Sequence, residues 1–464
     1  MKFNTVDINS FDDFRIGNSE SRSKGTGCTV IICEKGAVGG VDVRGGGPAT
    51  RETDLLRSEN SVESVYAVVL SGGSAFGLEA SSGVMRELRD RGIGLHFEKS
   101  VIPIVCGASL YDLEVGDPKA FPDIEMGKDA VRKAFNGSFR NGNSGAGTGC
   151  TVGKLKGMSR AMKTGLGTFA CTDGGLEVGA VAAVNAVGDI YNGAGNIIAG
   201  LRTEDGKKIY GTIRTFKNMV REDTYEPSVD DTIIIDTRDI AEAQSRIEHE
   251  ARMTEIAEAI RDEFRKTSGF SKEEIISAME AVMDDIPEET LFSGSGASPE
   301  DEYYLEGYEG HESLRSPEEA ETYGKHNRHG AAEAEARTEA PAEAAGSAAE
   351  EAHEGYASDE DLGYDIPFNT TIGCLVTNAK LTKPQANKLA SILHDAYARA
   401  IKPVHSTYDG DTIFVLATGR YEVNFDAFAA LATDVMQYAI IDGAFSAKHA
   451  YGLPAAGDLR TGGR

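Results

Sequence analysis

The chain has 464 residues, of which 40% are hydrophobic and 54 are glycine, so it can form one large or two medium globular domains rich in tight turns. Its formal net charge is −27 and no basic stripe stands out, which argues against nucleic acid and anionic membrane surfaces as partners. The N-terminal residues lack the basic-then-apolar plan of a signal peptide and no run of 18 apolar residues occurs, so we expect a cytoplasmic protein without a membrane partner.

The first predicted part of the chain, residues 1–293, combines apolar strands with glycine-rich turns. The Ser-Gly-Gly-Ser sequence at residues 71–74 and Gly92 are typical of the start and the end of a helix. Between residues 239 and 283 the pattern becomes helical, and Ser271 is the expected N-cap of the last helix there. Strands are expected at residues 27–33, 65–70, 145–152 and 176–187, and the earlier helix at residues 74–91.

Residues 294–368 are predicted to be an acidic, disordered linker. Between Glu300 and Asp361 the chain carries 19 acidic and 4 basic side chains, which supply −15 of the net charge of −27. Low hydrophobicity combined with high net charge cannot offset the entropy cost of ordering a chain. Four of the nine histidines lie here and could capture a metal, although solvated linker histidines are the favoured interpretation: His311, His326, His329 and His353.

The last part, residues 369–464, reads strand, helix, strand, helix. Two strands with two helices cannot bury their apolar faces alone. We therefore expect this part to complete a sheet that the first part begins, so that a cut between them would leave two fragments locked together. The strands are expected at residues 370–377 and 412–417, and the helices at residues 383–401 and 424–445.

Thr370 is the candidate nucleophile. It begins an apolar, β-branched strand directly after the acidic segment, an arrangement that suits a precursor cut between Asn369 and Thr370. The cut would give Thr370 a free amine that can accept its own hydroxyl proton, and an α-amino group has a pKa of about 7.7–8.0. The alternative is that the threonine only starts a strand. The Asn-Thr-Thr triplet also matches a glycosylation sequon, which would require secretion.

Asp409 and Asp411 flank Gly410 just before the strand that starts at Thr412. Their spacing can point both carboxylates to one side as the turn enters the strand. Such a pair could orient the threonine and tune its ammonium group, whereas the alternative is a plain Asp-Gly turn. A metal site is a weak interpretation, because no further oxygen ligands lie at a useful spacing.

Asn185 and Lys163 are the remaining candidates. Asn185 lies in an apolar run where a polar amide is costly unless it is hydrogen-bonded. Its NH₂ group could stabilise an oxyanion, or it could satisfy the backbone at the Gly188 turn. Lys163 could help to lower the pKa of the threonine, whereas a surface lysine before a glycine turn is the commoner explanation.

Other familiar sites do not fit the sequence. The glycine run at residues 45–47 lacks the lysine of a phosphate-binding loop, and Phe76 replaces the last glycine that a serine-hydrolase elbow at Ser74 would need. The six cysteines form no CxxC pair and no zinc-like cluster, which is typical of buried thiols in a reducing compartment. We expect no metal and no organic cofactor.

Several short motifs in one order resemble the DmpA-type aminopeptidases (L-aminopeptidase/D-esterase), which include the β-aminopeptidases and the nylon-oligomer hydrolase NylC. The resemblance extends over most of both parts of the chain. The acidic segment before Thr370 is longer than this family resemblance leads us to expect. The motifs are Gly27-Cys28-Thr29-Val30, Gly39-Gly40-Val41-Asp42-Val43-Arg44-Gly45-Gly46, Leu70-Ser71-Gly72-Gly73-Ser74-Ala75-Phe76-Gly77, Gly145-Ala146-Gly147-Thr148-Gly149, Val184-Asn185-Ala186, Asn369-Thr370-Thr371-Ile372 and Asp409-Gly410-Asp411-Thr412.

The resemblance implies an α/β, four-layer αββα sandwich of the N-terminal-nucleophile type, in assemblies of four or more protomers. It implies self-cleavage into an α chain ending at Asn369 and a β chain starting at Thr370. It also places the oxyanion asparagine at Asn185 and the carboxylate pair at Asp409 and Asp411. The transfer to Lys163 is the weakest, because Lys154 and Lys156 lie close enough in sequence to compete.

The sequence thus predicts a self-processing aminopeptidase or amidase that acts on small peptides or amides through an acyl-enzyme on Thr370. One alternative is an acyltransferase like ornithine acetyltransferase, which would pass the acyl group to an amine instead of water. Another is an unprocessed scaffold or binding protein. L-aminoacyl amides, D-residue esters, β-peptides and ω-amino-acid oligomers all remain open as substrates.

Overall fold

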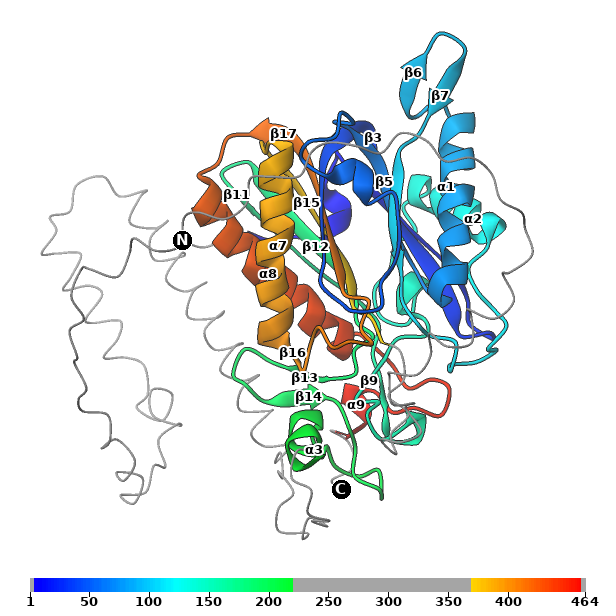
Figure 1. Cartoon of the computed structure of the whole chain (residues 1–464), viewed down its shortest axis with the longest axis vertical. Coiled ribbons are helices and arrows are strands. Elements are labelled where there is room, and N and C mark those ends of the chain that lie inside the picture. Colours follow the sequence, from blue (N-terminus) through cyan, green and yellow to red (C-terminus); the bar gives the residue numbers. More distant parts are fainter. Residues whose placement is uncertain (1–3, 220–368, 460–464) are drawn as a thin grey trace, which may run out of the picture. The chain divides into compact units, whose positions relative to one another are not determined.

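The computed structural model describes residues 4–219 and 369–459, which form four stacked layers: helices, a sheet, a second sheet, and helices again (Figure 1). The helical pattern predicted between residues 239 and 283, with its cap at Ser271, lies outside the described residues, and so does the predicted acidic linker, residues 294–368. No helix in the described ranges is both long and apolar enough to cross a bilayer.

The first sheet carries two helices on its outer face. α1 (Glu79–Asp90) and α2 (Ile124–Phe135) pack on it through a buried cluster that includes Val69 and Val84. Asp123 caps α2 by accepting a hydrogen bond from the Met126 N–H at 2.8 Å. The strands follow the order β2 (Arg15–Ser21), β3 (Thr26–Val43), β5 (Val65–Ser71), β8 (Val105–Ser109) and β4 (Ala49–Arg51).

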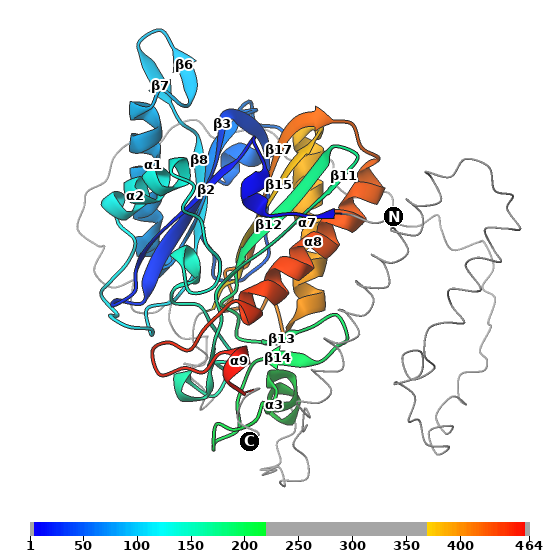
Figure 2. The same cartoon turned by 180° about the vertical axis from the view of Figure 1, so that it is seen from behind.

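The second sheet is covered by two longer helices, α7 (Lys383–Ala400) and α8 (Phe425–Phe445), which lie side by side in both views (Figures 1 and 2). Thr382 begins α7 with a reciprocal capping box, and Asn424 caps α8 as predicted. The strand order is β1 (Asn4–Thr5), β11 (Leu166–Asp173), β12 (Leu176–Ala183), β15 (Ile372–Ala379), β17 (Thr412–Tyr421) and the second half of β3.

Side-chain alternation along the strands builds the core between the two sheets. Cys374 and Val376 of β15 point into the layer between the sheets, whereas Leu375 packs against the helices α7 and α8. β17 alternates in the same way, with Phe414 facing inward and Val415 facing the helices. Each of these strands is therefore buried on both faces, which explains its nearly continuous apolar sequence.

β15 lies at the centre of the second sheet. It pairs antiparallel with β12, where Ile372 lies opposite Ala183, and parallel with β17, where Ile372 lies opposite Thr412. β17 in turn pairs with Val38–Val43 of β3. The two strands from the last part of the chain, β15 and β17, are therefore adjacent and lie between strands of the first part within one sheet.

Three predicted strands have different bounds in the structure. The strand expected at residues 176–187 stops at Ala183, and the side chain of Asn185 bonds instead to the Thr151 N–H and the Tyr111 carbonyl. The segment 145–152 contains only a two-residue strand, β9 (Thr151–Val152), and its glycines form a 3₁₀ turn at Gly145–Gly147. The strand expected at residues 27–33 is present but extends to Val43 in β3.

Short elements complete the described chain. The β6–β7 hairpin projects beyond α1 in both views (Figures 1 and 2). The short strands are β6 (Leu95–Phe97), β7 (Ser100–Ile102), β10 (Met162–Lys163), β13 (Asp189–Tyr191), β14 (Ile197–Ala199) and β16 (Ile401–Lys402). The remaining helices are α3 (Thr212–Met219), α9 (Ala456–Leu459) and 3₁₀ turns at Ile8–Ser10, Asp54–Leu56, Ser74–Leu78 and Met158–Arg160.

Candidate active site

The Asn369–Thr370 peptide bond is buried at the start of the central strand. Asn369 and Thr370 are 1% and 3% exposed in the uncleaved chain. Asn369 forms a parallel bridge with Asp409, and its N–H donates to the Tyr408 carbonyl at 3.1 Å. The bond is thus held by the strand pairing that β15 and β17 continue.

The Thr370 hydroxyl lies against the carbonyl of the bond that would be cut. Its Oγ1 donates a hydrogen bond to the Asn369 oxygen. The Gly410 N–H approaches both of these oxygens, with its nitrogen 3.0 Å from Asn369 O and 3.1 Å from Thr370 Oγ1. A Cβ atom at position 410 would lie 2.7 Å from Thr370 Oγ1, so the approach requires glycine. This arrangement places a hydroxyl, the candidate nucleophile, and a backbone N–H donor at one carbonyl.

The two carboxylates of the Asp-Gly-Asp turn have different partners. Asp411 Oδ1 accepts the Thr371 N–H at 2.7 Å, which ties it to the residue after the nucleophile. Asp409 Oδ2 accepts the Ser406 N–H at 2.7 Å, and Asp409 Oδ1 has no hydrogen-bond partner among the described residues. Burial, with the nearby Asp411 charge, raises the pKa of Asp409 to about 6. Of these two hydrogen bonds, the one to Asp411 reaches a neighbour of Thr370 and the one to Asp409 does not, so an action of the pair on Thr370 itself stays a prediction.

The glycine run at residues 45–47 packs directly on this turn. The Arg44 N–H donates to Asp411 O at 3.0 Å, and the Gly47 N–H donates to Asp409 O at 2.8 Å. A Cβ atom at Gly45 would lie 2.1 Å from Asp409 O. The glycines therefore allow backbone to approach backbone beside the candidate site.

Asn185 contacts the nucleophile through its main chain. Its carbonyl oxygen accepts the Thr370 N–H at 3.0 Å, the nitrogen that a cut would convert into the new amine. Its side chain is fully buried; Oδ1 accepts from the Thr151 N–H at 3.0 Å, and Nδ2 donates to the Tyr111 carbonyl at 2.7 Å. The predicted oxyanion role of Nδ2 is not visible in the uncleaved chain, where that group serves Tyr111.

Two buried lysines lie near this region, and only one of them contacts Asn185. Lys154 Nζ lies 2.9 Å from Asn185 Oδ1 and 3.3 Å from Asn185 O. The predicted Lys163 instead donates to three backbone carbonyls, those of Gly147, Cys150 and Thr164. Burial lowers the pKa of each lysine to about 8.

Sequence reasoning missed several groups of this site. Gly410 and Tyr111 contribute backbone atoms, which leave no side-chain signal in a sequence. The sequence offers Lys154 only as an alternative to Lys163 for the lysine of the site, because nothing in the local pattern tells which of the two side chains contacts Asn185. The Gly-Gly-Val-Asp-Val-Arg-Gly-Gly motif was the available signal that the loop before residue 48 packs on the site.

A protein-family model described as Peptidase family S58 matches residues 8–242 and 320–455 of the chain. The chain belongs to this family. The predicted resemblance to the DmpA-type aminopeptidases is thereby confirmed. Membership of a peptidase family supports hydrolysis of peptide or amide bonds.

Named relatives agree with this assignment. An uncharacterized aminopeptidase of Mycobacterium leprae is 45% identical over 176 residues, which cover 36% of this chain and 47% of that protein. An uncharacterized aminopeptidase of Mycobacterium tuberculosis (strain H37Rv) is 27% identical over 453 residues, which cover 94% of this chain and 90% of that protein. A 6-aminohexanoate-oligomer endohydrolase of a Kocuria species is 22% identical over 447 residues, covering 94% of this chain and 84% of that protein.

Among solved structures, a β-aminopeptidase of a Burkholderia species superposes with a TM-score of 0.50 at 14% identity, covering 99% of this chain and 92% of that one. This likeness shows a shared fold. Together with the four layers described above, it confirms the predicted α/β four-layer sandwich.

Proposed function

We propose that the chain is a self-processing hydrolase that cuts its own Asn369–Thr370 bond and then cleaves small peptides or amides through an acyl-enzyme on Thr370. The observation that carries the proposal is the Thr370 hydroxyl held against the Asn369 carbonyl, with the Gly410 N–H on both oxygens. The Gly410 contact to Asn369 O also belongs to the strand pairing, so the Thr370 hydroxyl on that same carbonyl is the part of the arrangement that a purely structural strand start does not require.

Self-processing begins with attack of Thr370 Oγ1 on the carbonyl carbon of Asn369. A C–O bond forms, the C–N bond to Thr370 breaks, and the hydroxyl proton goes to the departing amine, which leaves an ester between the two residues. Water then hydrolyses the ester to a carboxylate on Asn369 and a hydroxyl on Thr370. The Gly410 N–H stabilises the negative charge on the Asn369 oxygen during the attack.

After the cut, the Thr370 amine acts as the base for its own hydroxyl. Its nitrogen already lies 3.0 Å from the Asn185 carbonyl, which can accept one of the new N–H groups and orient the lone pair. Asn185 Nδ2 is our candidate donor to the substrate oxyanion, with Lys154 holding the amide in place. Burial lowers the pKa of Lys154 to about 8, so the ammonium form that donates to the amide still predominates at neutral pH.

The substrates that we propose are short peptides or amides with a free amino end. Relatives named aminopeptidase and 6-aminohexanoate-oligomer endohydrolase support this class, since both names describe hydrolysis of an amide bond. L-aminoacyl amides, β-peptides and ω-amino-acid oligomers are the panel to assay, with esters of D-residues as the fourth class.

The test is the intact mass of the purified protein, with Thr370→Ala and Thr370→Ser made in parallel. We expect fragments of 369 and 95 residues from the wild type and from Thr370→Ser, which keeps a hydroxyl, and a single 464-residue chain from Thr370→Ala. An uncut chain in all three proteins would refute self-processing and favour a scaffold. A cut enzyme that transfers its acyl group to an amine in preference to water would be an acyltransferase instead.

A further inference from the structure

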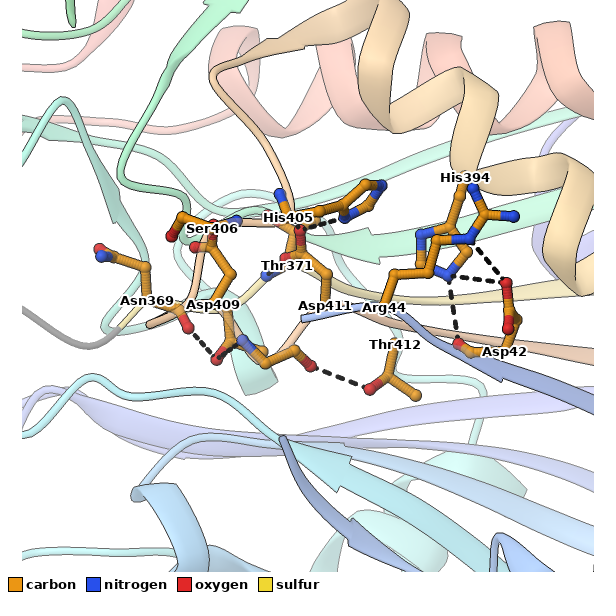
Figure 3. A network of polar contacts seen from close by, with 12 residues as sticks. Asp42, Arg44, Asn369, Thr371, His394, His405, Ser406, Asp409, Asp411 and Thr412 are labelled. Atoms are coloured by element: carbon orange, nitrogen blue, oxygen red, sulfur yellow. Dashed lines mark hydrogen bonds and ion pairs between the residues drawn. The ribbon is translucent and has the colours of Figure 1, made fainter. Parts of the chain in front are cut away.

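A histidine outside the predicted site stands behind the carboxylate of Asp411. His405 lies in the loop between β16 and β17, six residues before Asp411. Its Nδ1 lies 2.8 Å from Asp411 Oδ2, and its backbone nitrogen lies 3.2 Å from the same oxygen (Figure 3). An ionised carboxylate only accepts hydrogen bonds, so Nδ1 carries the hydrogen of this contact.

The backbone of His405 is held in an unusual conformation to make both contacts. Its φ angle is +58°, in the left-handed region that residues other than glycine rarely adopt. Such a conformation is unfavourable for a residue with a Cβ atom and persists only where the surroundings hold it in place. Here the two contacts to one carboxylate oxygen provide that restraint.

Asp411 connects His405 to the residues that lead into β15, directly after Thr370. The side chain is 1% exposed, and its second oxygen accepts the Thr371 N–H at 2.7 Å. The next backbone contact, from the Thr412 N–H to the Thr371 carbonyl, measures 3.2 Å. A buried carboxylate is costly unless its oxygens are hydrogen-bonded, and both Asp411 oxygens are used, one by His405 and one by the residue after Thr370.

Packing fixes the other side of the His405 ring. The rings of His394 and Tyr397, both on α7, have centroids 4.7 Å and 6.2 Å from it. His394 itself contacts Asp42 instead of Asp411, and burial lowers the pKa of His394 to about 4, which keeps its ring neutral. His405 is therefore the imidazole that holds Asp411, while Nε2 of His405 has no hydrogen-bond partner among the described residues.

We propose that His405 is a positioning residue. It fixes the Asp411 carboxylate, which holds the Thr371 N–H and thereby keeps the Thr370 hydroxyl in place against the Asn369 carbonyl. The inference rests on the proposed self-processing at Thr370. A displacement of about 1 Å at a reacting centre can cost roughly 100-fold in rate. The loss of His405 is thus expected to slow the cut without touching a reacting atom.

The experiment follows the appearance of the 95-residue fragment during cell-free synthesis of full-length chains. His405→Ala removes the ring. His405→Asn keeps an N–H donor close to the place of Nδ1 and tolerates positive φ, whereas His405→Gln moves its donor toward Nε2. We expect cutting to slow about 10- to 100-fold in His405→Ala and His405→Gln, and to return to within a few-fold of wild type in His405→Asn.

The outcomes separate this inference from the proposed function. His449→Ala, at an exposed histidine paired with Asp458, is the matched control and should be cut at the wild-type rate. Circular dichroism and thermal unfolding of each chain exclude misfolding as the cause. Wild-type cutting in His405→Ala, or equal slowing in His405→Asn and His405→Ala, would overturn the positioning role alone. An uncut wild type would instead overturn self-processing.

Discussion

Lys154 and Lys163 lie nine residues apart and share every property that usually marks a functional lysine. Both are buried, at 2% and 0% exposure, and burial lowers the pKa of each to about 8. Their partners differ, since Lys163 ends among three backbone carbonyls and Lys154 ends on Asn185. Burial and a shifted pKa therefore identify an unusual lysine, but its partners tell what it does.

A third lysine supports this distinction. Lys383 begins α7 and donates to the carbonyls of Leu55, Asn60 and Val62 at 2.9, 2.7 and 2.9 Å. Like Lys163, it supplies hydrogen bonds to main-chain acceptors that would otherwise be buried without donors. Three carbonyls around an ammonium thus indicate a structural role in this fold. Lys154 instead contacts Asn185, whose carbonyl oxygen accepts the Thr370 N–H.

The largest effect is expected from Lys154→Met, which keeps the length of the side chain and removes its donor. Without the ammonium, Asn185 loses the contact at 2.9 Å that holds its amide, and we expect the rate of self-cleavage to fall about 100-fold. The measurement is a time course of intact mass. Lys163→Met is the matched control, and equal slowing in both variants would erase the distinction between the two lysines.

Lys163→Met should instead destabilise the fold. The substitution leaves the carbonyls of Gly147, Cys150 and Thr164 without their donor, at roughly 1 kcal/mol or more each, so we expect a loss of about 3 kcal/mol in unfolding free energy. Urea unfolding should be measured in the Thr370→Ala background, where the chain stays in one piece. A loss below 1 kcal/mol would show that the hydrogen bonds from Lys163 to these three carbonyls contribute little to stability.

A smaller effect is expected in the pH dependence of the stability that Lys163 contributes. The pKa of Lys163 is about 8 when folded and 10.5 as an ordinary lysine, so between these values the folded chain binds fewer protons and its stability rises with pH. The stability gap between the Thr370→Ala chain and its Lys163→Met derivative should widen from pH 8 toward pH 10.5. Urea midpoints at three pH values in this window test it, and a constant gap would contradict the shifted pKa.

Much of the fold follows from the sequence because the central strands are apolar on both faces and the helices have clear boundaries. The strand at residues 65–70 and the Asn424 cap illustrate this. The apolar neighbours of Asn185 predict a strand through residue 187, but the strand ends at Ala183 and the Asn185 side chain bonds to Tyr111 and Thr151. Local patterns do not report such tertiary partners, and for the same reason the contacts of Lys154 with Asn185 and of His405 with Asp411 could not be predicted.

The central position of β15 has a consequence for how this protein can be handled. Once the Asn369–Thr370 bond is cut, the chain starting at Thr370 supplies two adjacent inner strands of the sheet and both helices that cover it. Refolding a cut molecule then requires two chains to meet, so recovery after denaturation depends on concentration, whereas the uncut chain refolds alone. If the chain processes itself as proposed, folding therefore precedes the cut, and we expect heat or urea to inactivate the cut form far less reversibly than the uncut chain.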